Sequence, residues 1–270
     1  MVAGRMLAAV LILCTAGAAL AEGVAPGQTA PSQPQRVVSV NLCTDQLAML
    51  IAAPGQLRSV SWLAADPAVS VMAGQAQDWP QNDGSAEQVF LMQPDLVLAG
   101  TYSTGPAVQM LRRLGIRVET LPPASSIADI RQAITRMGRL LGQPERAARL
   151  LAAFDADLAA IRPLAPRLAA SYAANGFSDG PDSLAGDAMR HAGLRLIAEA
   201  TGGATPLETL VMAAPEVLVT GSRYAPPSRA EAVLDHPAFR AIEAARYSVP
   251  DRDWMCGLPA IADTIAQLAR

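Results

Sequence analysis

The sequence predicts an α/β protein made of two lobes with parallel sheets, joined by a single long helix. Apolar strand patterns alternate with helical patterns through residues 36–121, as parallel β-α-β construction requires. A motif at residues 87–100 recurs 121 positions later at residues 208–221, which indicates a second, related lobe. Between the two copies, residues 144–161 predict a helix roughly 27 Å long at ~1.5 Å per residue. That length is enough to bridge two lobes.

The N-terminus has the pattern of a secretory signal peptide. A single positive charge at Arg5 precedes an apolar stretch, and a small-x-small cleavage site ends at Ala21. Residues 1–21 are therefore predicted to be removed on export. Cys14 raises the alternative of lipid attachment, which the large Leu13 before it disfavours.

Composition narrows the class of protein. The formal charge is -3 and becomes -4 once Arg5 is removed, which argues against a nucleic-acid-binding surface. Hydrophobic residues make up 51% and charged residues 17%, enough for buried parallel sheets. No later apolar run approaches the ~20 residues that span a bilayer, so the protein is expected to be soluble after export. We also expect it to be a monomer. We divide the exported chain into a flexible leader at 22–35, an N-terminal lobe at 36–143, the connecting helix at 144–162 and a C-terminal lobe at 163–270.

In the first lobe, strands and helices are separated by helix breakers. Val37–Val40 is a β-branched run, and Thr44 or Asp45 can cap the helix that follows. Pro94 stops one helix, and Gly115 closes another. The predicted strands are 37–40, 57–62, 95–99 and 116–121, and the predicted helices are 44–52, 85–92, 106–114 and 126–141.

The second lobe is predicted mainly from the repeat. Each copy has a Glu near a helix start, a Pro that stops the helix, an acid, an apolar strand and a Gly. Such turns are common singly in α/β proteins, but agreement at four positions favours pseudo-symmetric lobes. A further strand is predicted at 167–172, after Pro163 and Pro166 end the long helix. The matched residues are Glu87 and Glu208, Pro94 and Pro215, Asp95 and Glu216, and Gly100 and Gly221.

With these elements in order, the chain resembles the cobalamin, iron-siderophore and haem class of periplasmic solute-binding proteins, of which vitamin B12-binding proteins are examples. The resemblance covers residues 36–270. Each motif is weak alone, and their order and spacing carry the likeness. The segments are Arg36–Leu47, Ser85–Glu87 with Met92–Leu98, Leu114–Val118 and Trp254–Pro259.

The resemblance implies both a fold and a function. The fold is the class III arrangement of two Rossmann-like lobes joined by one helix, with the ligand held between them and little closure. The function is that of the periplasmic substrate-binding component of an ABC importer, not of an enzyme. It implies capture of a cobalamin or other corrinoid, or of a ferric siderophore, with haem as the alternative. No resident cofactor is implied, because the chelate brings its own cobalt or iron.

The resemblance also implies one exposed acid per lobe that docks onto arginines of the membrane permease. Glu87 and Glu208, the paired members of the repeat, match those acids. A Glu at a helix start is ordinarily a capping or dipole choice, and that explanation remains open.

The loops after the predicted strands hold the candidate ligand contacts, because ligands of open α/β sheets sit beyond the carboxyl ends of strands. Aromatic rings gather there, although they make up only 4% of the chain, and they suit a macrocycle or a catecholate. The alternative is that Trp62 and Trp254 plug the lobe ends. Arg223 can pair with an anionic chelate or be a surface residue, and Asp253 can accept from ligand amides or be a turn acid. The aromatic candidates are Trp62, Tyr102, Phe177, Tyr224 and Trp254.

Cys43 and Cys256 lie in the first loop of one lobe and the last loop of the other. An oxidising compartment favours a disulfide between them. Unpaired thiols lining the cleft and thiolate ligation of a bound metal are the alternatives. Members of the class commonly lack a cysteine at the first position, so this departure leaves the ligand open.

Three functions other than chelate import are alternatives for this sequence. A cysteine-dependent enzyme would use Cys43 with His191 or His236 as base, but both histidines suit surface positions and no G-x-S-x-G elbow occurs. A binding protein for free zinc or manganese needs more than two histidines. A receptor accessory that presents ligand to a signalling partner cannot be separated from transport by sequence.

Overall fold

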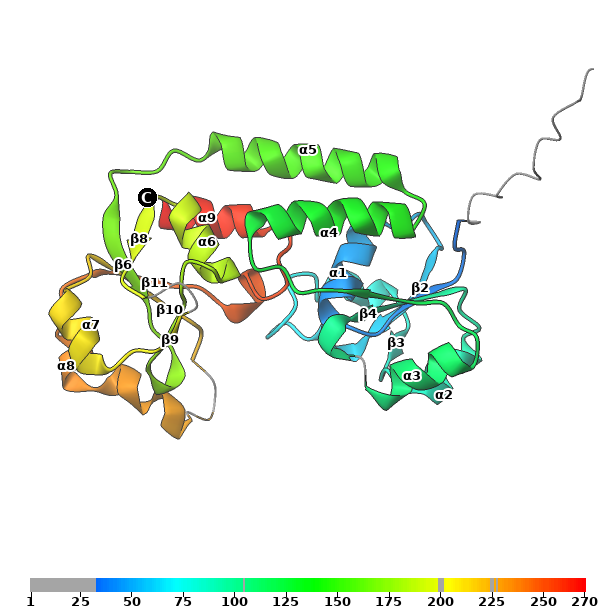
Figure 1. Cartoon of the computed structure of the whole chain (residues 1–270), viewed down its shortest axis with the longest axis horizontal. Helices are drawn as coiled ribbons and strands as arrows, with labels where there is room; N and C mark the ends of the chain where they lie inside the picture. Colours follow the sequence, from blue (N-terminus) through cyan, green and yellow to red (C-terminus); the bar gives the residue numbers. More distant parts are fainter. Residues whose placement is uncertain (1–32, 104, 199–201, 224–225, 227) are drawn as a thin grey trace, which may run out of the picture. The chain divides into compact units, whose positions relative to one another are not determined.

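The computed structural model describes residues 33–103, 105–198, 202–223, 226 and 228–270. Residues 33–270 form one compact unit with two parallel sheets (Figure 1). The predicted signal peptide, Cys14, most of the predicted leader and Tyr224 lie outside the described residues. Within the described ranges, no helix has the length and apolar character needed to cross a bilayer.

The first sheet has five parallel strands in the order β3-β2-β1-β4-β5. Its helices are α1 (Leu42–Ile51), α2 (Ala86–Leu91), α3 (Pro106–Arg113) and α4 (Ile127–Leu140). Four strands agree with the sequence, whereas the two-residue β3 was not predicted. The strands are β1 (Val37–Ser39), β2 (Leu57–Ser61), β3 (Gln81–Asn82), β4 (Leu96–Gly100) and β5 (Val118–Leu121).

The cap of α1 differs from the prediction. The N-cap is Asn41, whose side-chain oxygen accepts from the backbone N–H groups of Cys43 and Thr44. The Thr44 hydroxyl instead hydrogen-bonds to Ser39 Oγ at 2.8 Å and donates to the Asn41 carbonyl at 3.0 Å. Thr44 and Asp45 therefore lie inside the first turn, because an Asn just before a helix satisfies its free donors equally well.

The second sheet has four parallel strands in the order β11-β10-β6-β8. They are β6 (Arg167–Ser171), β8 (Leu194–Leu196), β10 (Val217–Thr220) and β11 (Ala245–Ser248). A separate antiparallel pair joins β7 (Phe177–Ser178) to β9 (Gly203–Ala204). The accompanying helices are α6 (Leu184–His191), α7 (Leu207–Ala213), α8 (Pro237–Arg240) and α9 (Ile261–Leu268).

The long helix is α5 (Pro144–Ala160), which follows the first sheet in sequence and precedes the second. Figure 1 shows it lying along α4 and above α9. Phe154 on α5 is buried, and Asp155 pairs with Arg131 of α4 at 2.7 Å. The prediction of two parallel-sheet lobes with one long connecting helix is confirmed.

The two copies of the sequence repeat fold alike. Each forms a short helix, a Pro-containing turn and an interior strand of its sheet, as α2-β4 and α7-β10. In the first copy, Asp95 accepts from the backbone N–H of Arg36 at 2.9 Å, just before β1. In the second, Glu216 accepts from the backbone N–H of Leu168 in β6 at 3.0 Å. The acid that the two copies share therefore accepts a hydrogen bond from the backbone at or next to the neighbouring strand in both lobes.

The lobes share one hydrophobic core. A single buried cluster includes Leu98 of β4 and Ile134 of α4 together with Val219 of β10 and Ile265 of α9. A close-packed interior of this kind opposes separate movement of its halves. The cluster explains why residues 33–270 form one compact unit.

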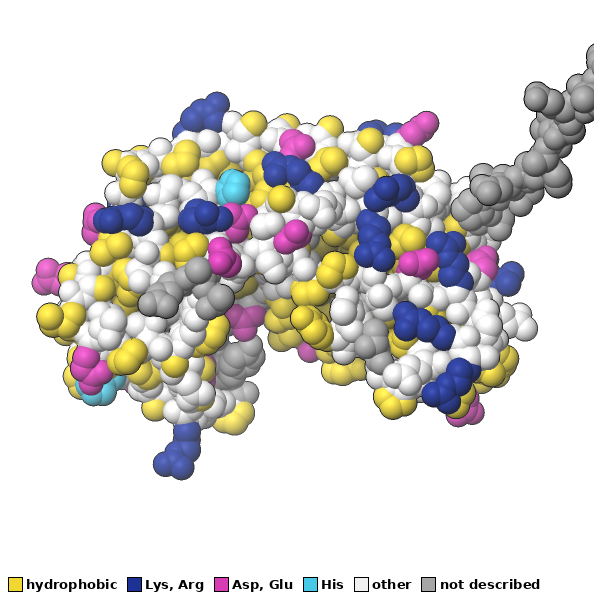
Figure 2. All heavy atoms as spheres, viewed as in Figure 1, with side chains coloured by type: hydrophobic (Ala, Val, Ile, Leu, Met, Phe, Trp, Pro, Cys, Tyr) yellow, Lys and Arg dark blue, Asp and Glu magenta, His cyan; other side chains and the backbone are white. Residues whose placement is uncertain are grey.

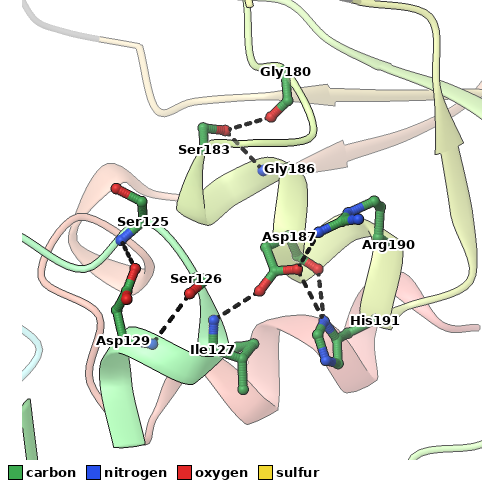
Figure 3. Close-up of polar contacts among 10 residues, drawn as sticks. All are labelled: Ser125, Ser126, Ile127, Asp129, Gly180, Ser183, Gly186, Asp187, Arg190 and His191. Atoms are coloured by element: carbon green, nitrogen blue, oxygen red, sulfur yellow. Dashed lines mark hydrogen bonds and ion pairs between the residues drawn. The ribbon is translucent and has the colours of Figure 1, made fainter. Parts of the chain in front are cut away.

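A polar contact also crosses between the lobes, at the N-terminus of α4 (Figure 3). The buried carboxylate of Asp187, on α6, accepts from the backbone N–H of Ile127 at 2.7 Å and from Arg190 at 2.6 Å. Ser126 caps α4 by accepting from the Asp129 N–H at 3.1 Å. Asp187 thus gives α4 a second acceptor from the other lobe, where a helix N-terminus favours negative charge.

Candidate functional site: a cavity between the lobes

A cavity of about 730 Å³, counted with its open mouth, lies where loops of both lobes meet. Figure 2 shows hydrophobic side chains bordering the hollow between the lobes. Its walls follow the carboxyl ends of β1, β4 and β5, the edge at which parallel sheets bind ligands. The other lobe contributes the loop before α9. The lining residues are Asn41, Cys43, Thr44, Leu47, Gly100, Thr101, Tyr102, Ser103, Leu121, Pro122, Pro123, Ala124, Ala133, Met255, Cys256 and Gly257.

A disulfide joins Cys43 to Cys256, with their Cα atoms 4.9 Å apart. Cys43 lies in the first turn of α1, and Cys256 in the loop before α9, so the bond connects the two lobes. Both cysteines line the cavity. Of the three alternatives that the sequence left, the structure has the disulfide, and neither sulfur is a free thiolate.

The lining contains no charged side chain among the described residues. Pro122, Pro123 and Met255 form apolar surface, and Tyr102 is 88% exposed at the same cavity. The polar side chains of the cavity lining are hydroxyls and the amide of Asn41. Asn41 Nδ2 donates to Ser103 Oγ at 3.0 Å. Such a wall has the chemistry to contact the apolar faces of a large molecule and to orient it with a few hydrogen bonds.

The close approach of β4 to Asn41 requires a glycine. A Cβ at Gly100 would lie 2.9 Å from the Asn41 side-chain nitrogen, closer than real side chains come. Gly100 ends the first copy of the repeat, so this position serves the cavity as well as the fold.

A second hollow of about 550 Å³ adjoins the cavity across the wall formed by Leu121, Pro122, Pro123 and Ala124. It adds charged groups from α4, including Arg136, whose guanidinium lies 3.9 Å from Glu119. The apolar cavity therefore has a charged margin on the N-terminal lobe.

Asp45 is fully buried in the first turn of α1, directly after the cavity residue Thr44. Burial raises the pKa of Asp45 to about 6, and the hydrogen bond from the Ser61 hydroxyl offsets part of this rise. Ser61 Oγ donates to its Oδ2, whereas Oδ1 has no hydrogen-bond partner among the described residues. A buried carboxyl of this kind is costly to ionise.

Two of the predicted ligand contacts, Cys43 and Tyr102, line the cavity. Trp62 begins a short 3-10 turn and is 54% exposed, outside the lining. Trp254 precedes the lining residue Met255 and packs against the shared core, as the alternative of a structural plug describes. The ligand roles of both tryptophans stay predictions.

The other described candidates also lie outside the lining. Phe177 is half-exposed on β7. Arg223 already has two acidic partners, Glu231 at 3.4 Å and Asp235 at 2.8 Å. Asp253 lies 3.6 Å from the Arg252 guanidinium. Their ligand roles remain predictions.

Sequence reasoning missed Asn41, the Pro122–Pro123 wall and Met255. Ligand loops follow strands, and that rule indicated these segments. Within them only aromatic rings were taken as candidates, although proline and methionine also provide apolar contacts. Pro122 directly follows β5, so the signal was present.

The two histidines have local structural partners. His191 Nδ1 lies 2.9 Å from the carbonyl oxygen of Asp187, and His236 accepts from the Ala238 N–H at 3.1 Å as the cap of α8. With Cys43 in a disulfide, the Cys–His arrangement of the enzyme alternative is not present. Across the described part of the chain, no three His, Cys, Asp or Glu side chains gather as a metal site.

Glu87 and Glu208 are exposed residues in the first turns of α2 and α7. Neither lines the cavity. Figure 1 places α2 and α7 at opposite ends of the view, one in each lobe. The two carboxylates are thus available at separate surfaces.

Comparisons with known proteins agree with this architecture. A cobalamin-binding protein of Halobacterium salinarum (strain ATCC 29341 / DSM 671 / R1) is 28% identical over 204 residues, 72% of this chain. The match spans 55% of that relative, about half of its length.

Two solved structures share the fold. The periplasmic heme-binding protein HutB of Vibrio cholerae has a TM-score of 0.72 at 17% identity, over 87% of this chain and 98% of that chain. The periplasmic vitamin B12-binding protein BtuF of Vibrio cholerae has a TM-score of 0.62 at 15% identity, over 88% and 96%. The model of the periplasmic binding protein family matches residues 37–248, well over half of the sequence. The chain therefore belongs to the periplasmic binding protein family.

Proposed function

We propose that this protein is the substrate-binding component of an ABC importer, and that it captures a bulky metal chelate between its lobes. The foremost candidate is a corrinoid, followed by a ferric siderophore. The observation that carries the proposal is the uncharged, largely apolar cavity at the carboxyl ends of the strands. The likeness to cobalamin-binding and vitamin B12-binding proteins supports the ligand class.

The lining favours a complete chelate over a naked ion. Zinc and similar ions need several imidazole, thiolate or carboxylate donors, and the described lining has none of these groups. A chelate carries its own donor atoms, and a macrocycle or a catecholate has apolar ring faces beside its polar groups. Pro122, Pro123 and Met255 provide contact area for such faces.

Haem is the alternative ligand to these two, and Tyr102 favours it. The ring is 88% exposed at the cavity, and a tyrosine oxygen is an established axial ligand of haem iron. The heme-binding protein HutB shares the fold. A haem complex through Tyr102 would show a charge-transfer spectrum that the Tyr102→Phe variant lacks.

The remaining parts of the proposal concern location and delivery. Residues 1–21 direct export to the periplasm and are removed near Ala21. The mature protein is a monomer that delivers its ligand to permease subunits in the inner membrane. Glu87 and Glu208 supply one docking carboxylate per lobe, which their exposure and their equivalence in the repeat support.

Ligand titration tests the proposal. Purified protein is titrated with cobalamin, ferric siderophores and haem, and separately with Zn²⁺ and Mn²⁺. We expect submicromolar binding of one chelate, cobalamin first, and weak or no binding of the free ions. Failure of every chelate to bind below micromolar concentration would refute the proposed ligand class.

A further inference from the structure

α2 and α7 expose the same arrangement of side chains. In α2, Glu87 is followed three and four positions later by Phe90 and Leu91. In α7, Glu208 is followed at the same spacing by Val211 and Met212. Residues three and four apart lie on one face of a helix, so each carboxylate shares a face with two large apolar side chains. We call these two surfaces the N-lobe epitope (Glu87, Phe90, Leu91) and the C-lobe epitope (Glu208, Val211, Met212).

The exposed fractions also match between the lobes. Phe90 and Val211 are 46% and 40% exposed, and Leu91 and Met212 are 73% and 85% exposed. A single exposed apolar residue is ordinary, but an apolar pair at equivalent places in two lobes needs a reason. The folded chain does not supply one, because each helix is already anchored by a fully buried side chain, Val89 or Leu210.

A shallow hollow adjoins each epitope. Phe90 and Leu91 border one of about 800 Å³, counted with its open mouth, whose wall also includes Pro94, Ile116 and Arg36. Val211, without Met212, borders one of about 870 Å³, counted in the same way, whose wall includes Ala214, Ile242 and Glu243. Both hollows adjoin the turn that ends the helix of the repeat. Each epitope therefore combines one carboxylate with an apolar surface that a side chain of a partner can enter.

We infer that the two epitopes together dock onto a membrane permease built from two equivalent halves, each presenting a basic side chain flanked by apolar ones. The inference rests on the proposed function and adds the apolar component to it. Two like surfaces in one chain fit a partner that carries its receiving surface twice. Apolar contacts around an ion pair exclude water, which strengthens the pair and adds affinity that an exposed pair alone lacks.

Charge argues against a second copy of this chain as the occupant. The epitopes are acidic, and the chain carries a formal charge of -3. Pairing one epitope with another would bring carboxylates together, and like charges across an interface are costly. A basic partner surface has no such penalty.

Binding to the cognate permease–ATPase complex in lipid nanodiscs tests the inference. The variants are Leu91→Ser, Met212→Ser and the double change, with Leu164→Ser as the control because Leu164 is 56% exposed and belongs to neither epitope. We expect each single change to weaken binding several-fold and the double change to weaken it at least tenfold, with the control unaffected. Cobalamin titration and thermal melting of the same variants should be unchanged.

A Glu87→Arg/Glu208→Arg variant separates this inference from the proposed function. If that variant loses permease binding while Leu91→Ser/Met212→Ser binds like the wild type, the apolar contribution is refuted and carboxylate docking stands. If the wild type does not bind the permease, both fail. Sedimentation decides the remaining alternative: wild-type dimers that become monomers in the Leu91→Ser/Met212→Ser variant would identify a second copy as the occupant and overturn the inference.

Discussion

Gln93 and Ala214 adopt the same left-handed backbone conformation, with φ of 49° and 46°, at the point where α2 and α7 each end. They are equivalent in the repeat, one residue before Pro94 and Pro215. A left-handed conformation costs a non-glycine residue about 1–2 kcal/mol, because its Cβ crowds the backbone. Both lobes thus carry the same local strain at the same turn.

Replacing Ala214 by Gly should stabilise the protein. Glycine adopts positive φ without a Cβ penalty, and its greater freedom in the unfolded chain offsets part of the gain, leaving roughly 0.5–1 kcal/mol. Ala213→Gly is the matched control: Ala213 is the last residue of α7, so Gly there should destabilise. Denaturant unfolding measures both, and a loss of stability in Ala214→Gly would contradict the strain explanation.

Asp45 should make stability depend on pH. Its pKa is raised from 3.8 to about 6 in the folded protein, chiefly by burial. As pH rises, the carboxyl of Asp45 loses its proton in the unfolded chain at a lower pH than in the folded protein. The free energy of unfolding therefore falls between about pH 4 and pH 6. At 1.36 kcal/mol per pKa unit, the loss is on the order of 3 kcal/mol.

Asp45→Asn should remove that fall, because Asn stays neutral and its oxygen still accepts from Ser61. The measurement is the free energy of unfolding of wild type and variant from pH 2 to pH 8, a range that covers the titration of both Asp45 and Asp83. Asp83→Asn is a control of opposite sign, since the pKa of this exposed carboxyl is lowered by hydrogen bonds from Ser85. Parallel curves for wild type and Asp45→Asn would refute the assignment.

Removing the disulfide should cost both stability and ligand affinity. Cys43 and Cys256 are 213 residues apart, and closure of so long a loop predicts a loss of about 5 kcal/mol. Ligand affinity should also fall, because both cysteines line the cavity and hold its two sides together. Cys43→Ser/Cys256→Ser and reduced wild-type protein should behave alike in denaturant unfolding and cobalamin titration. Wild-type stability in both would show that the shared core alone holds the lobes.

Tyr102 provides a test of the cavity as the binding site. Tyr102→Ala should weaken chelate binding by about 2 kcal/mol, the cost expected for an aromatic ring that the bound ligand covers. The same change at Trp62 and at Trp254 tests the predicted contacts that lie outside the lining. An unchanged dissociation constant in both tryptophan variants would assign those rings to the fold.

Docking by Glu87 and Glu208 is tested by charge reversal. Changing both to Arg should abolish ligand-stimulated transport in reconstituted vesicles without altering ligand affinity, because neither residue lines the cavity. Glu145→Arg is the matched control, since Glu145 is an exposed first-turn Glu of α5 outside the repeat. If the variant with both charges reversed transports normally, the docking role is refuted, and the two Glu residues serve only to stabilise the helix starts.

The sequence predicts the parts of this fold whose signals are local. Pro94 and Pro215 follow the helix in each copy of the repeat, and the apolar runs after them form the interior strands β4 and β10. β3, β7 and β9 have two residues each, too few to show a periodic pattern, and they exist because neighbouring segments pair with them.

The site was less accessible to sequence reasoning, because it depends on which loops meet across the lobes. Tyr102 and Trp62 both follow strands of the first sheet, yet only Tyr102 lines the cavity. Their sequence contexts are alike. Only the three-dimensional arrangement, with Cys256 brought from the other lobe, separates them.

The bond between Cys43 and Cys256 also sets an order of events in the life of the protein. Its second sulfur is made 213 residues after the first, so in an exported chain Cys43 reaches the oxidising side long before its partner. Throughout that interval Cys43 is a lone thiol, open to mixed disulfides with other cysteine-bearing molecules. In such a chain the disulfide can form only after Cys256 has also crossed, and a product truncated before Cys256 would keep Cys43 as an unpaired thiol.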